Sequence, residues 1–579
     1  MTGSSVRLYL DAARNMRPRQ LAYRGRRLLS LRIVAAGTRE RDPAAWRPLA
    51  GGLAVDRAPQ SGPVPAPHLD GSFTGVGARR AFVDAAVFWS PGQDGLLFAF
   101  HLHGFSELAR YAAGEPEPGA DEFWVAVISS WLAHGRPPSM PGWHPYPMSG
   151  RIMAWSAALS RGGWPHELET QMLRSLTRQT AVLRRSVEHD IGGNHVLRNA
   201  VALVFAGVCL GERPLADRAL ALLRAQLARQ VLPDGGHEER STSYHRAIVA
   251  DLLDLEQLLN RSGATAPGWL QSALLRMQSW ERDMRGPDGA LPMLNDAWEG
   301  PRFSAPPRSE ISALRASGYV VLRDGGDQAI LDVGPLAAPH LPPHAHADLL
   351  SLVLWTDGRP VVVDPGSFAY TGPERRAFRS TAAHNTVEVD GRDQCELWGD
   401  FRAAFMPAVT HCDVDRYGDI TVVSAGHDGY RRLGDPVVHE RTFLWLAGDG
   451  IVVLDRLLAA RAHRVASRLH LAPGIDGAAM TAGPLRFAAL GCGVAAGARA
   501  GRYAPHLGRA QPIDVLEYAL DVHPLQWFGW SLLRTATTVS LDGEVLTVRR
   551  PGSDTVHLHV TAGRWSPSDA AHGRRTAAT

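Results

Sequence analysis

Apolar residues recur at intervals of three and four from about residue 75 to residue 293, a spacing that is typical of amphipathic helices. Short stretches rich in Gly, Pro and Asp, such as 233–236 and 285–289, separate the apolar segments. Because helices joined by such short turns pack as antiparallel neighbours, this part of the chain predicts a toroid of paired helices. The segments with the clearest helical spacing are Leu168–Val187, Val196–Leu210, Leu215–Leu232, Ile248–Leu259 and Leu270–Met284.

After Ser309 the apolar spacing changes to two, which is typical of β-strands. Asp-Gly dipeptides at 357–358, 449–450 and 542–543 each separate two apolar runs and indicate hairpin turns. We therefore predict a large antiparallel sheet system, arranged as a β-sandwich. The predicted strands are Tyr319–Leu322, Ala329–Val333, Leu350–Trp355, Arg359–Val363, Thr386–Val389, Ile420–Ser424, Thr442–Leu446, Ile451–Leu454, Val515–Tyr518, Thr537–Leu541 and Val545–Val548.

These patterns divide the chain into four parts. Residues 1–74 form an Arg-rich extension and residues 75–305 form the helical domain. A Pro- and Ser-containing stretch, Gly300–Pro307, marks the linker to the antiparallel sandwich of residues 306–567. Residues 568–579 are expected to be a disordered tail.

The composition excludes several classes of function. All 61 basic residues are arginine, which removes the P-loop lysine and Schiff-base or pyridoxal-phosphate chemistry. A net charge of +3 over 579 residues does not favour a nucleic-acid partner. No run approaches the roughly 18 apolar residues of a membrane-spanning helix. Arginines interrupt Met1–Gly37, so we expect no secretory signal and a cytoplasmic location, with a periplasmic one left open.

Three clusters of polar residues could carry chemistry. The first is Gly192-Gly193-Asn194-His195, directly before a predicted helix. Asn and His at such a position can simply cap the helix. The N-terminus of a helix also attracts anions, so an amide and an imidazole there would make a receptor for a carboxylate.

The second cluster is the stretch 234–245, which leads into the next predicted helix. It contains six ionisable side chains together with Tyr244, and a solvated loop would use similar residues. Tyr244 is followed by His245, and Arg240 precedes it by four residues. This combination favours a functional role over mere solubility.

The third cluster is His344-Ala345-His346-Ala347-Asp348, followed by Asp364 and by His384. The alternation of His with Ala places both imidazoles on one face of an extended segment. A lone histidine is more often structural. Two histidines and one aspartate brought together by strands fit the ligand set of zinc.

Five stretches that contain these clusters resemble the heparinase II/III family of polysaccharide lyases. The stretches are WHPYPMSGRIMAW (Trp143–Trp155), GGNHVLRNAVALVFAG (Gly192–Gly207), LPDGGHEERSTSYH (Leu232–His245), HAHADLLSLVLWTDGRPVVVDPGSFAY (His344–Tyr370) and RSTAAHNTVEVDGRDQ (Arg379–Gln394). The resemblance implies an incomplete (α/α) toroid followed by an antiparallel β-sandwich, with the active site in the cleft between them.

The resemblance also implies roles for individual residues in cleavage by β-elimination. Asn194, with His195 beside it, matches the position that neutralises the substrate carboxylate. Tyr244 and His344 match the catalytic pair, and which of them is the base is left open. A tyrosine has an ordinary pKa of about 10 and needs a cationic neighbour to act as a base. Arg240 and His245 are the nearest candidates in the sequence.

The same resemblance assigns a metal site and sugar subsites. His346, Asp364 and His384 align with metal ligands, and we expect a zinc ion with a mainly structural role. Trp143, Tyr146 and Arg151 are expected to line sugar subsites together with His245, and packing inside a helix is the alternative for the first three.

The expected substrate is a polysaccharide or oligosaccharide that contains uronic acid. The Arg-rich segment Asn15–Leu29 is similar to that of family members associated with bacterial exopolysaccharide synthesis, which favours remodelling of the cell's own polymer. Two alternatives stay open: a glycoside hydrolase using two of Asp234, Glu238 and Glu239, and a non-catalytic polysaccharide-binding or assembly protein. The sequence leaves the polymer and the oligomeric state undecided.

Overall fold

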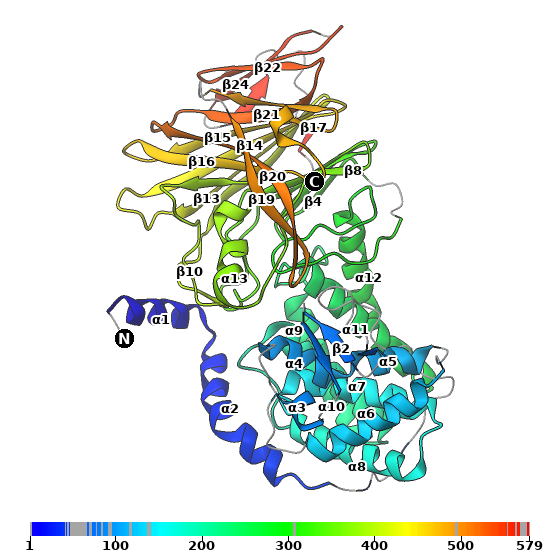
Figure 1. Ribbon diagram of the computed structural model, residues 1–579. Coiled ribbons are helices and arrows are strands. Elements are labelled where there is room, and N and C mark those ends of the chain that lie inside the picture. The colour runs from blue at the N-terminus through cyan, green and yellow to red at the C-terminus, as the bar shows by residue number, and fades with distance from the viewer. Residues whose placement is uncertain are drawn as a thin grey trace. The chain divides into compact units, whose positions relative to one another are not determined.

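In a computed structural model, the chain forms two compact units, one mainly helical and one built of β-strands (Figure 1). The helical unit comprises Met16–Glu238 and Ser243–Gln278, and the β unit comprises Met1–Asn15, Glu239–Thr242 and Ser279–Thr579. The residues that the structure describes are 3–40, 42, 46, 67–68, 72–76, 78–82, 85–90, 95–114, 118–135, 141–304, 309–491, 496–552, 554–561, 564–567 and 576–577. No helix in these ranges combines the length and the apolar character needed to cross a membrane.

The five helices predicted from apolar spacing are confirmed as α8 to α12. Among the described residues the helices of the chain are α1 (Gly3–Asn15), α2 (Pro18–Gly37), α3 (Ala85–Phe88), α4 (Gly95–Gly104), α5 (Ser106–Ala113), α6 (Ala120–His134), α7 (Pro145–Arg161), α8 (His166–Leu183), α9 (Gly193–Cys209), α10 (Arg213–Gln230), α11 (Thr242–Arg261), α12 (Gly268–Met284) and α13 (Gly372–Arg379). A small sheet of β1 (Pro67–His68), β2 (Ser72–Gly75) and β3 (Ala78–Ala81) accompanies the helical unit.

Helices α7 and α9 form the centre of the helical unit. Nearly all of their side chains are buried, whereas α8 and α10 are amphipathic and expose a polar face. Gly207 lets α9 and α10 approach each other closely, because a Cβ atom at this position would lie 2.6 Å from the backbone nitrogen of Ala216 in α10. The central position of α7 and α9 brings their polar residues into the interior of the unit.

The β unit consists of antiparallel sheets. The eight-stranded sheet has the order β17 (Thr481–Ala482), β18 (Leu485–Leu490), β21 (Phe528–Arg534), β15 (Gly450–Leu458), β14 (Val437–Leu446), β13 (Ile420–Tyr430), β12 (Val409–Tyr417) and β26 (Thr576–Ala577). The five-stranded sheet contains β4 (Ile311–Leu314), β5 (Tyr319–Asp324), β6 (Asp327–Asp332), β7 (Leu352–Thr356) and β8 (Arg359–Val362). One four-stranded sheet contains β19 (Gly497–His506), β20 (Arg509–Val522), β16 (His463–His470) and β9 (Val387–Val389). A second four-stranded sheet contains β22 (Thr538–Asp542), β23 (Val545–Arg549), β24 (Val556–Thr561) and β25 (Arg564–Pro567). A short pair is formed by β10 (Leu397–Trp398) and β11 (Arg402–Ala403).

The sandwich has a central sheet that is covered on both faces. Phe443 and Trp445 of β14 pack into the core shared with β9, β16 and β20, and Leu444 and Leu446 pack into the core shared with β23 and β24. In Figure 1, β22 and β24 lie on one side of β14 and β15, and β16 and β20 lie on the other. Burial of both faces explains why β14 ends in a continuous apolar run instead of an alternating one.

The unit boundaries differ from the predicted domain boundaries of 75–305 and 306–567. The end of α12 belongs to the β unit, because Trp280 and Met284 pack against Leu314 and Tyr319 of the five-stranded sheet. The packing therefore changes near Ser279, before the predicted linker, whose residues 305–308 lie outside the described residues.

The two ends of the chain also differ from the prediction. Helix α1 belongs to the β unit, where Tyr9 contacts Trp398, whereas α2 belongs to the helical unit. Within the tail predicted to be disordered, Thr576 and Ala577 form β26 and pair with β12, because the edge of β12 offers free backbone groups. Residues 568–575 and 578–579 of that tail, and most of 41–74, lie outside the described residues.

Candidate active site and metal group

The first polar group of the helical unit lies at the start of α9. Gly192 and Gly193 have φ angles of 82° and 53°, a left-handed conformation that favours glycine and turns the chain into the helix. Asn194 and His195 follow in the first turn. The side chain of Asn194 is buried, and that of His195 is 21% exposed.

A buried carboxylate that sequence analysis did not identify lies beside His195. Nδ1 of His195 is 3.1 Å from Oε1 of Glu188, and Nδ1 of His144 is 3.7 Å from the same oxygen. The ring of Tyr146 lies 4.6 Å from the ring of His195, and the guanidinium of Arg198 lies over Tyr146. Glu188 stands between two helices in a stretch without periodicity, so no spacing rule points to it.

A small cavity of about 30 Å³ adjoins this group and is lined by Tyr146, His101 and Arg198 among others. Nη1 of Arg198 is 3.9 Å from Oδ1 of Asp251. Burial, together with the charge of Arg198, lowers the pKa of His101 to about 4. Arg198 is therefore a cation in the same cavity where His101 is neutral at physiological pH.

The predicted residues around α11 are placed differently from one another. Tyr244 is half-buried in the first turn of α11. His245 is buried, and its Nε2 lies 3.1 Å from the backbone oxygen of Met277 in α12. This contact joins α11 to α12, and the predicted substrate-binding role of His245 stays a prediction.

Arg240 contacts backbone groups of the β unit. Its guanidinium donates to the backbone oxygens of Ala316 and Ser317 in the β unit, and its own backbone oxygen accepts from Tyr319. Its φ of 59° is unusual for a residue with a side chain. These contacts anchor the two Nη atoms of Arg240 in the β unit, and its predicted catalytic role stays a prediction.

Two of the three residues predicted to bind sugar in α7 and in the segment before it are buried. Trp143 donates to the backbone oxygen of Gly135, and its ring lies 6.3 Å from that of Trp131. Arg151 is fully buried, and burial lowers its pKa to about 9. The packing alternative therefore applies to Trp143 and Arg151, while Tyr146 alone is partly accessible and lines the small cavity.

In the β unit, one carboxylate organises both histidines of the His-x-His segment. Oδ2 of Asp296 lies 2.9 Å from Nδ1 of His344, and Oδ1 lies 3.1 Å from Nε2 of His346. Arg375 forms a two-pronged ion pair with the same carboxylate. Burial alone would raise the pKa of Asp296, but Arg375 and the two histidines hold it well below its ordinary value. The predicted alternation is confirmed in that both imidazoles face one group.

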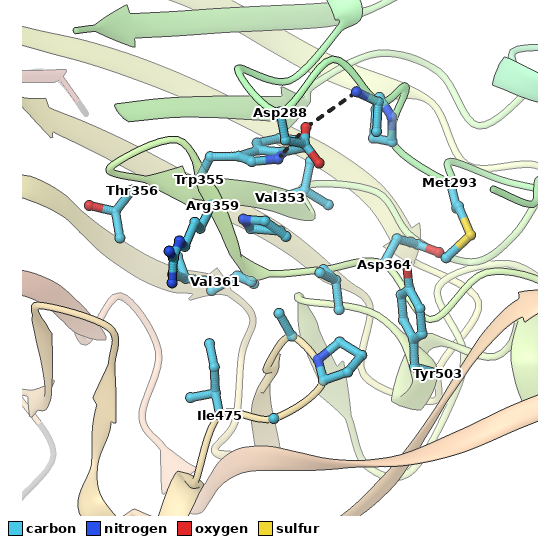
Figure 2. A pocket seen from close by; sticks show the side chains of 18 of the residues that line it. Asp288, Met293, Val353, Trp355, Thr356, Arg359, Val361, Asp364, Ile475 and Tyr503 are labelled. Atoms are coloured by element: carbon cyan, nitrogen blue, oxygen red, sulfur yellow. Dashed lines mark hydrogen bonds between the residues drawn. The ribbon is translucent and has the colours of Figure 1, made fainter. Parts of the chain in front are cut away.

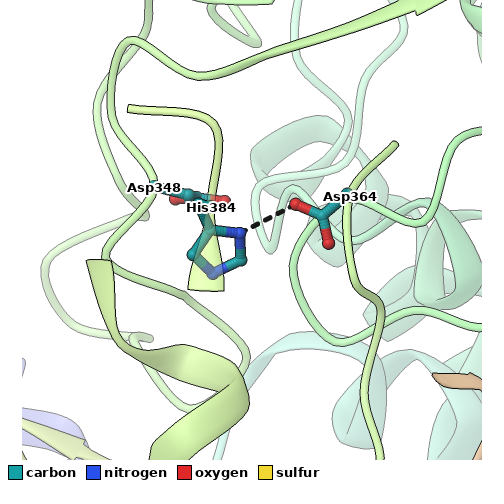
Figure 3. A group of neighbouring side chains, drawn as sticks. All are labelled: Asp348, Asp364 and His384. Carbon is teal, nitrogen blue, oxygen red and sulfur yellow. Dashed lines mark hydrogen bonds and ion pairs between the residues drawn. The ribbon is translucent and has the colours of Figure 1, made fainter. Parts of the chain in front are cut away.

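Within the described part of the chain, Asp348, Asp364 and His384 form a group that could hold a metal ion. One ligand atom from each lies within 4.8 Å of the others, and all three residues are buried (Figure 3). Nδ1 of His384 is 2.9 Å from Oδ2 of Asp364. The structure therefore groups Asp364 and His384, two of the three predicted ligands, with Asp348. His346 contacts Asp296 through Nε2, but its Nδ1 is buried without a hydrogen-bond partner among the described residues and its ring lies 5.2 Å from that of His384, so its role as a ligand stays a prediction.

The chemistry of this group fits a zinc ion. Nε2 of His384 and Oδ1 of Asp348 are buried without a hydrogen-bond partner among the residues that the structure describes. Burial raises the pKa of Asp348 to about 7. Burial would lower the pKa of His384, but the facing Asp364 carboxylate raises it. A cation would satisfy both orphan atoms, and a mixed nitrogen and oxygen ligand set suits zinc better than calcium or magnesium.

A pocket of about 820 Å³ in the β unit reaches the same group through Asp364 (Figure 2). Trp355 and Tyr503 contribute aromatic walls. Oδ1 of Asp288 accepts from Trp355 Nε1 at 3.0 Å, and Oδ2 is 3.0 Å from Nη1 of Arg302. The lining thus combines apolar strand residues with the ion pair of Asp288 and Arg302.

Comparison with known proteins identifies the family. Residues 105–307 match the heparinase II/III N-terminus, and residues 306–577 match the heparinase II/III-like C-terminal domain. The chain belongs to the heparinase II/III-like family. All the predicted site residues of this family member lie within the matched region.

The curated relatives of this heparinase II/III-like chain carry two different names. FtsZ-localized protein C of Caulobacter vibrioides is 28% identical over 385 residues, which cover 62% of this chain and 64% of that protein. Heparin-sulfate lyase of Pedobacter heparinus is 24% identical over 411 residues, which cover 61% of this chain and 58% of that protein. The chain therefore matches less than two thirds of the length of each of these relatives.

Solved structures confirm the predicted fold, an incomplete toroid followed by a β-sandwich. Heparinase III superposes with a TM-score of 0.66 at 16% identity, over 79% of this chain and 83% of that one. Heparan sulfate lyase HepC from Pedobacter heparinus superposes with a TM-score of 0.56 at 16% identity, over 93% and 92% of the two chains. At such identities the likeness shows the fold of this heparinase II/III-like protein.

The buried position of Arg151 makes a testable prediction about stability. Its Nε donates to Oε1 of Gln179, and its Nη atoms donate to the backbone oxygens of His103 and Gly142. Arg151→Ala would leave these buried acceptors unpaired, at about 1–3 kcal/mol each. We expect the free energy of unfolding in urea to fall by about 3–5 kcal/mol.

A matched control is Arg218→Ala, because Arg218 is exposed on α10. This change should alter the free energy of unfolding by no more than about 0.5 kcal/mol. A loss for Arg151→Ala as small as that of the control would return Arg151 to the set of candidate substrate-binding residues.

Proposed function

We propose that this chain is a polysaccharide lyase that cleaves a uronate-containing polymer by β-elimination. The observation that carries the proposal is the pairing of His344 with the buried Asp296 at 2.9 Å. A histidine whose Nδ1 donates to a carboxylate is held in one orientation, and its other ring nitrogen, Nε2, is the atom that accepts or releases a proton. Family membership and the presence of Tyr244 support the same chemistry.

The reaction requires three tasks of the protein. The C5 proton of a uronic acid lies next to a carboxylate, so it becomes acidic only when that negative charge is neutralised. Asn194, His195 and the start of α9 supply donors and a positive dipole end for this purpose. A base must then remove the C5 proton, and an acid must protonate the departing glycosidic oxygen. We assign these two tasks to Tyr244 and His344.

Zinc has a supporting place in the proposal. Asp348, Asp364 and His384 would hold the ion, which would supply positive charge to a buried cluster of carboxylates. Since Asn194 and His195 neutralise the substrate, proton transfer needs no metal-bound hydroxide. We therefore propose a structural role for the ion.

The biological substrate that we propose is the cell's own exopolysaccharide. The similarity of Asn15–Leu29 to proteins of exopolysaccharide synthesis supports remodelling of this polymer, in the cytoplasm or in the periplasm. The heparin-sulfate lyases among the relatives support a uronate polymer as the chemical class.

A panel of uronate polymers tests the proposal. Purified protein is incubated with heparan sulfate, hyaluronan, alginate, glucuronan and bacterial capsules, and absorbance in the ultraviolet is followed together with reducing ends. Elimination leaves a double bond conjugated to the carboxylate, and we expect absorbance to rise in step with reducing ends. New reducing ends without absorbance would refute the lyase and indicate the glycoside hydrolase.

One observation favours a second candidate, a non-catalytic assembly protein. A relative with 28% identity is named FtsZ-localized protein C, a name that describes a location and no enzymatic activity. Binding of a polymer from the panel with neither absorbance nor reducing ends would favour this candidate.

A further inference from the structure

Glu188 is a completely buried carboxylate beside two imidazoles of the helical unit. Its side chain is 0% exposed, and its Oε1 approaches Nδ1 of His195 at 3.1 Å and Nδ1 of His144 at 3.7 Å. Its Oε2 accepts from Nδ2 of Asn199 at 3.3 Å, and its backbone nitrogen donates to Oδ1 of Asn199. The neutral Asn199 fixes the carboxylate in place but leaves its charge to be balanced elsewhere.

A fully buried carboxylate needs a cationic partner or a proton, because removing an isolated charge from water has a desolvation penalty of several kcal/mol. His195 is the better partner of the two histidines. Nδ1 of His144 already accepts from the backbone nitrogen of Tyr146 at 3.4 Å, so this atom carries no hydrogen in that arrangement. Nδ1 of His195 is closer to Glu188 and can carry one.

Arg198 is the arginine that shares α9 with His195. Arg198 lies over the ring of Tyr146, 5.5 Å from its centre, and faces Asp251. Burial raises the pKa of Asp251, and Arg198 opposes that shift. The titratable and charged groups around His195 are His144 and Tyr146 of α7, Arg198 of its own helix, Asp251 of α11, His101 of α4, and Glu188, His189 and Asp190 of the preceding loop.

We propose that Glu188 is a positioning residue that holds His195 as an imidazolium ion and fixes its orientation. The ring of Tyr146, 4.6 Å away, fixes the plane of the imidazole. Because the side chain of His195 is partly exposed, its charge is available to an anion. Resting on the proposed function, this makes His195 a charged receptor for the carboxylate of the uronic acid, with Asn194 as its neutral companion.

Titration of His195 by NMR tests the electrostatic part without any enzymatic activity. The resonance is assigned by its loss in His195→Gln. In the wild type we expect a pKa above the ordinary value of about 6.5, and in Glu188→Gln we expect it to fall by about one unit or more. Ser149→Ala serves as the control, because it removes a partner of Asn199 and leaves the charge of Glu188 intact.

Binding of small ligands tests the role in recognition. Methyl β-D-glucuronide carries the carboxylate, and methyl β-D-glucoside lacks it. We expect the glucuronide, but not the glucoside, to shift the His195 resonance, and the affinity for the glucuronide to fall about tenfold in Glu188→Gln.

Several outcomes would overturn the proposal. A wild-type His195 pKa at or below about 6.5 does so without any variant, which covers the case that Glu188→Gln does not fold. An unchanged His195 pKa in folded Glu188→Gln, or an equal fall in Ser149→Ala, does so as well. Equal binding of the two glycosides refutes the carboxylate receptor. Failure of the polymer assay alone would refute the lyase and leave the titration result standing.

Discussion

Tyr244→Phe and His344→Ala are each expected to reduce the turnover of polymer cleavage at least about a hundredfold, the usual scale for losing a positioned acid or base. Each variant removes one group that can carry a proton. If Tyr244 and His344 are the base and the acid of one elimination step, either loss interrupts the same step. The turnover of the double variant should then be only slightly lower than that of the less active single variant. Initial rates of the rise in ultraviolet absorbance provide the measurement.

Both variants should fold. Phenylalanine fills the space of the half-buried Tyr244 ring. Removal of the His344 imidazole leaves Asp296 paired, because Arg375 still donates to both of its oxygens. The thermal transition should therefore stay close to that of the wild type.

Two substitutions provide matched controls for these rates. Tyr111→Phe removes a hydroxyl that donates to Asp121 in the helical unit, and His523→Ala removes an exposed imidazole of the β unit. Both should retain wild-type turnover. Near-normal turnover in Tyr244→Phe would show that this tyrosine only packs or caps α11.

Removal of the metal group is expected to have the second large effect. His384→Ala and Asp348→Asn should each lose about one zinc per chain by elemental analysis, because the group of three ligand atoms loses a member. A site saturated a thousandfold above its Kd stabilises the folded state by about 4 kcal/mol. We therefore expect the melting temperature to fall by roughly 5–10 °C, and a chelator to have the same effect on the wild type.

His346→Gln distinguishes the ligand set that the structure forms from the one predicted from sequence. If Asp348, Asp364 and His384 hold the ion without Nδ1 of His346, this variant should retain zinc while Asp348→Asn loses it. Loss of zinc from His346→Gln and retention in Asp348→Asn would support the predicted ligand set instead. A wild-type protein without metal, and with stability and activity unaffected by chelator, would reduce the group to a hydrogen-bond network.

Local sequence patterns were sufficient to predict helices α8 to α12, eleven of the strands and the order of the two fold types. The spacing of three and four reflects one buried face on each of α8 to α12, and the spacing of two reflects the pleat of the strands. Strand β19 (Gly497–His506) was missed because its sequence, GARAGRYAPH, contains little apolar alternation and most of its side chains are exposed. Its pairing with β20, not its own propensity, makes it a strand.

Sequence motifs likewise located candidate site residues but not all of their surroundings. Asn194, Tyr244, His344, Asp364 and His384 were all identified from residue types and local order. Buried charges are a different matter, because their partners are chosen by packing and can come from anywhere in the chain. Asp296 precedes His344 by 48 residues, and no local pattern connects the two.

The contacts of His346 and Asp348 show where the sequence stops being sufficient. The alternation of the His-x-His segment correctly placed two imidazoles on one face, because that requires only neighbouring dihedral angles. Whether that face meets the metal group or Asp296 depends on the fold of distant segments. The sequence alone therefore determined the family, the two fold types and the reactive residue types. The tertiary structure decided the charge partners, since a buried Asp or Glu is stable only beside the cations that packing brings to it.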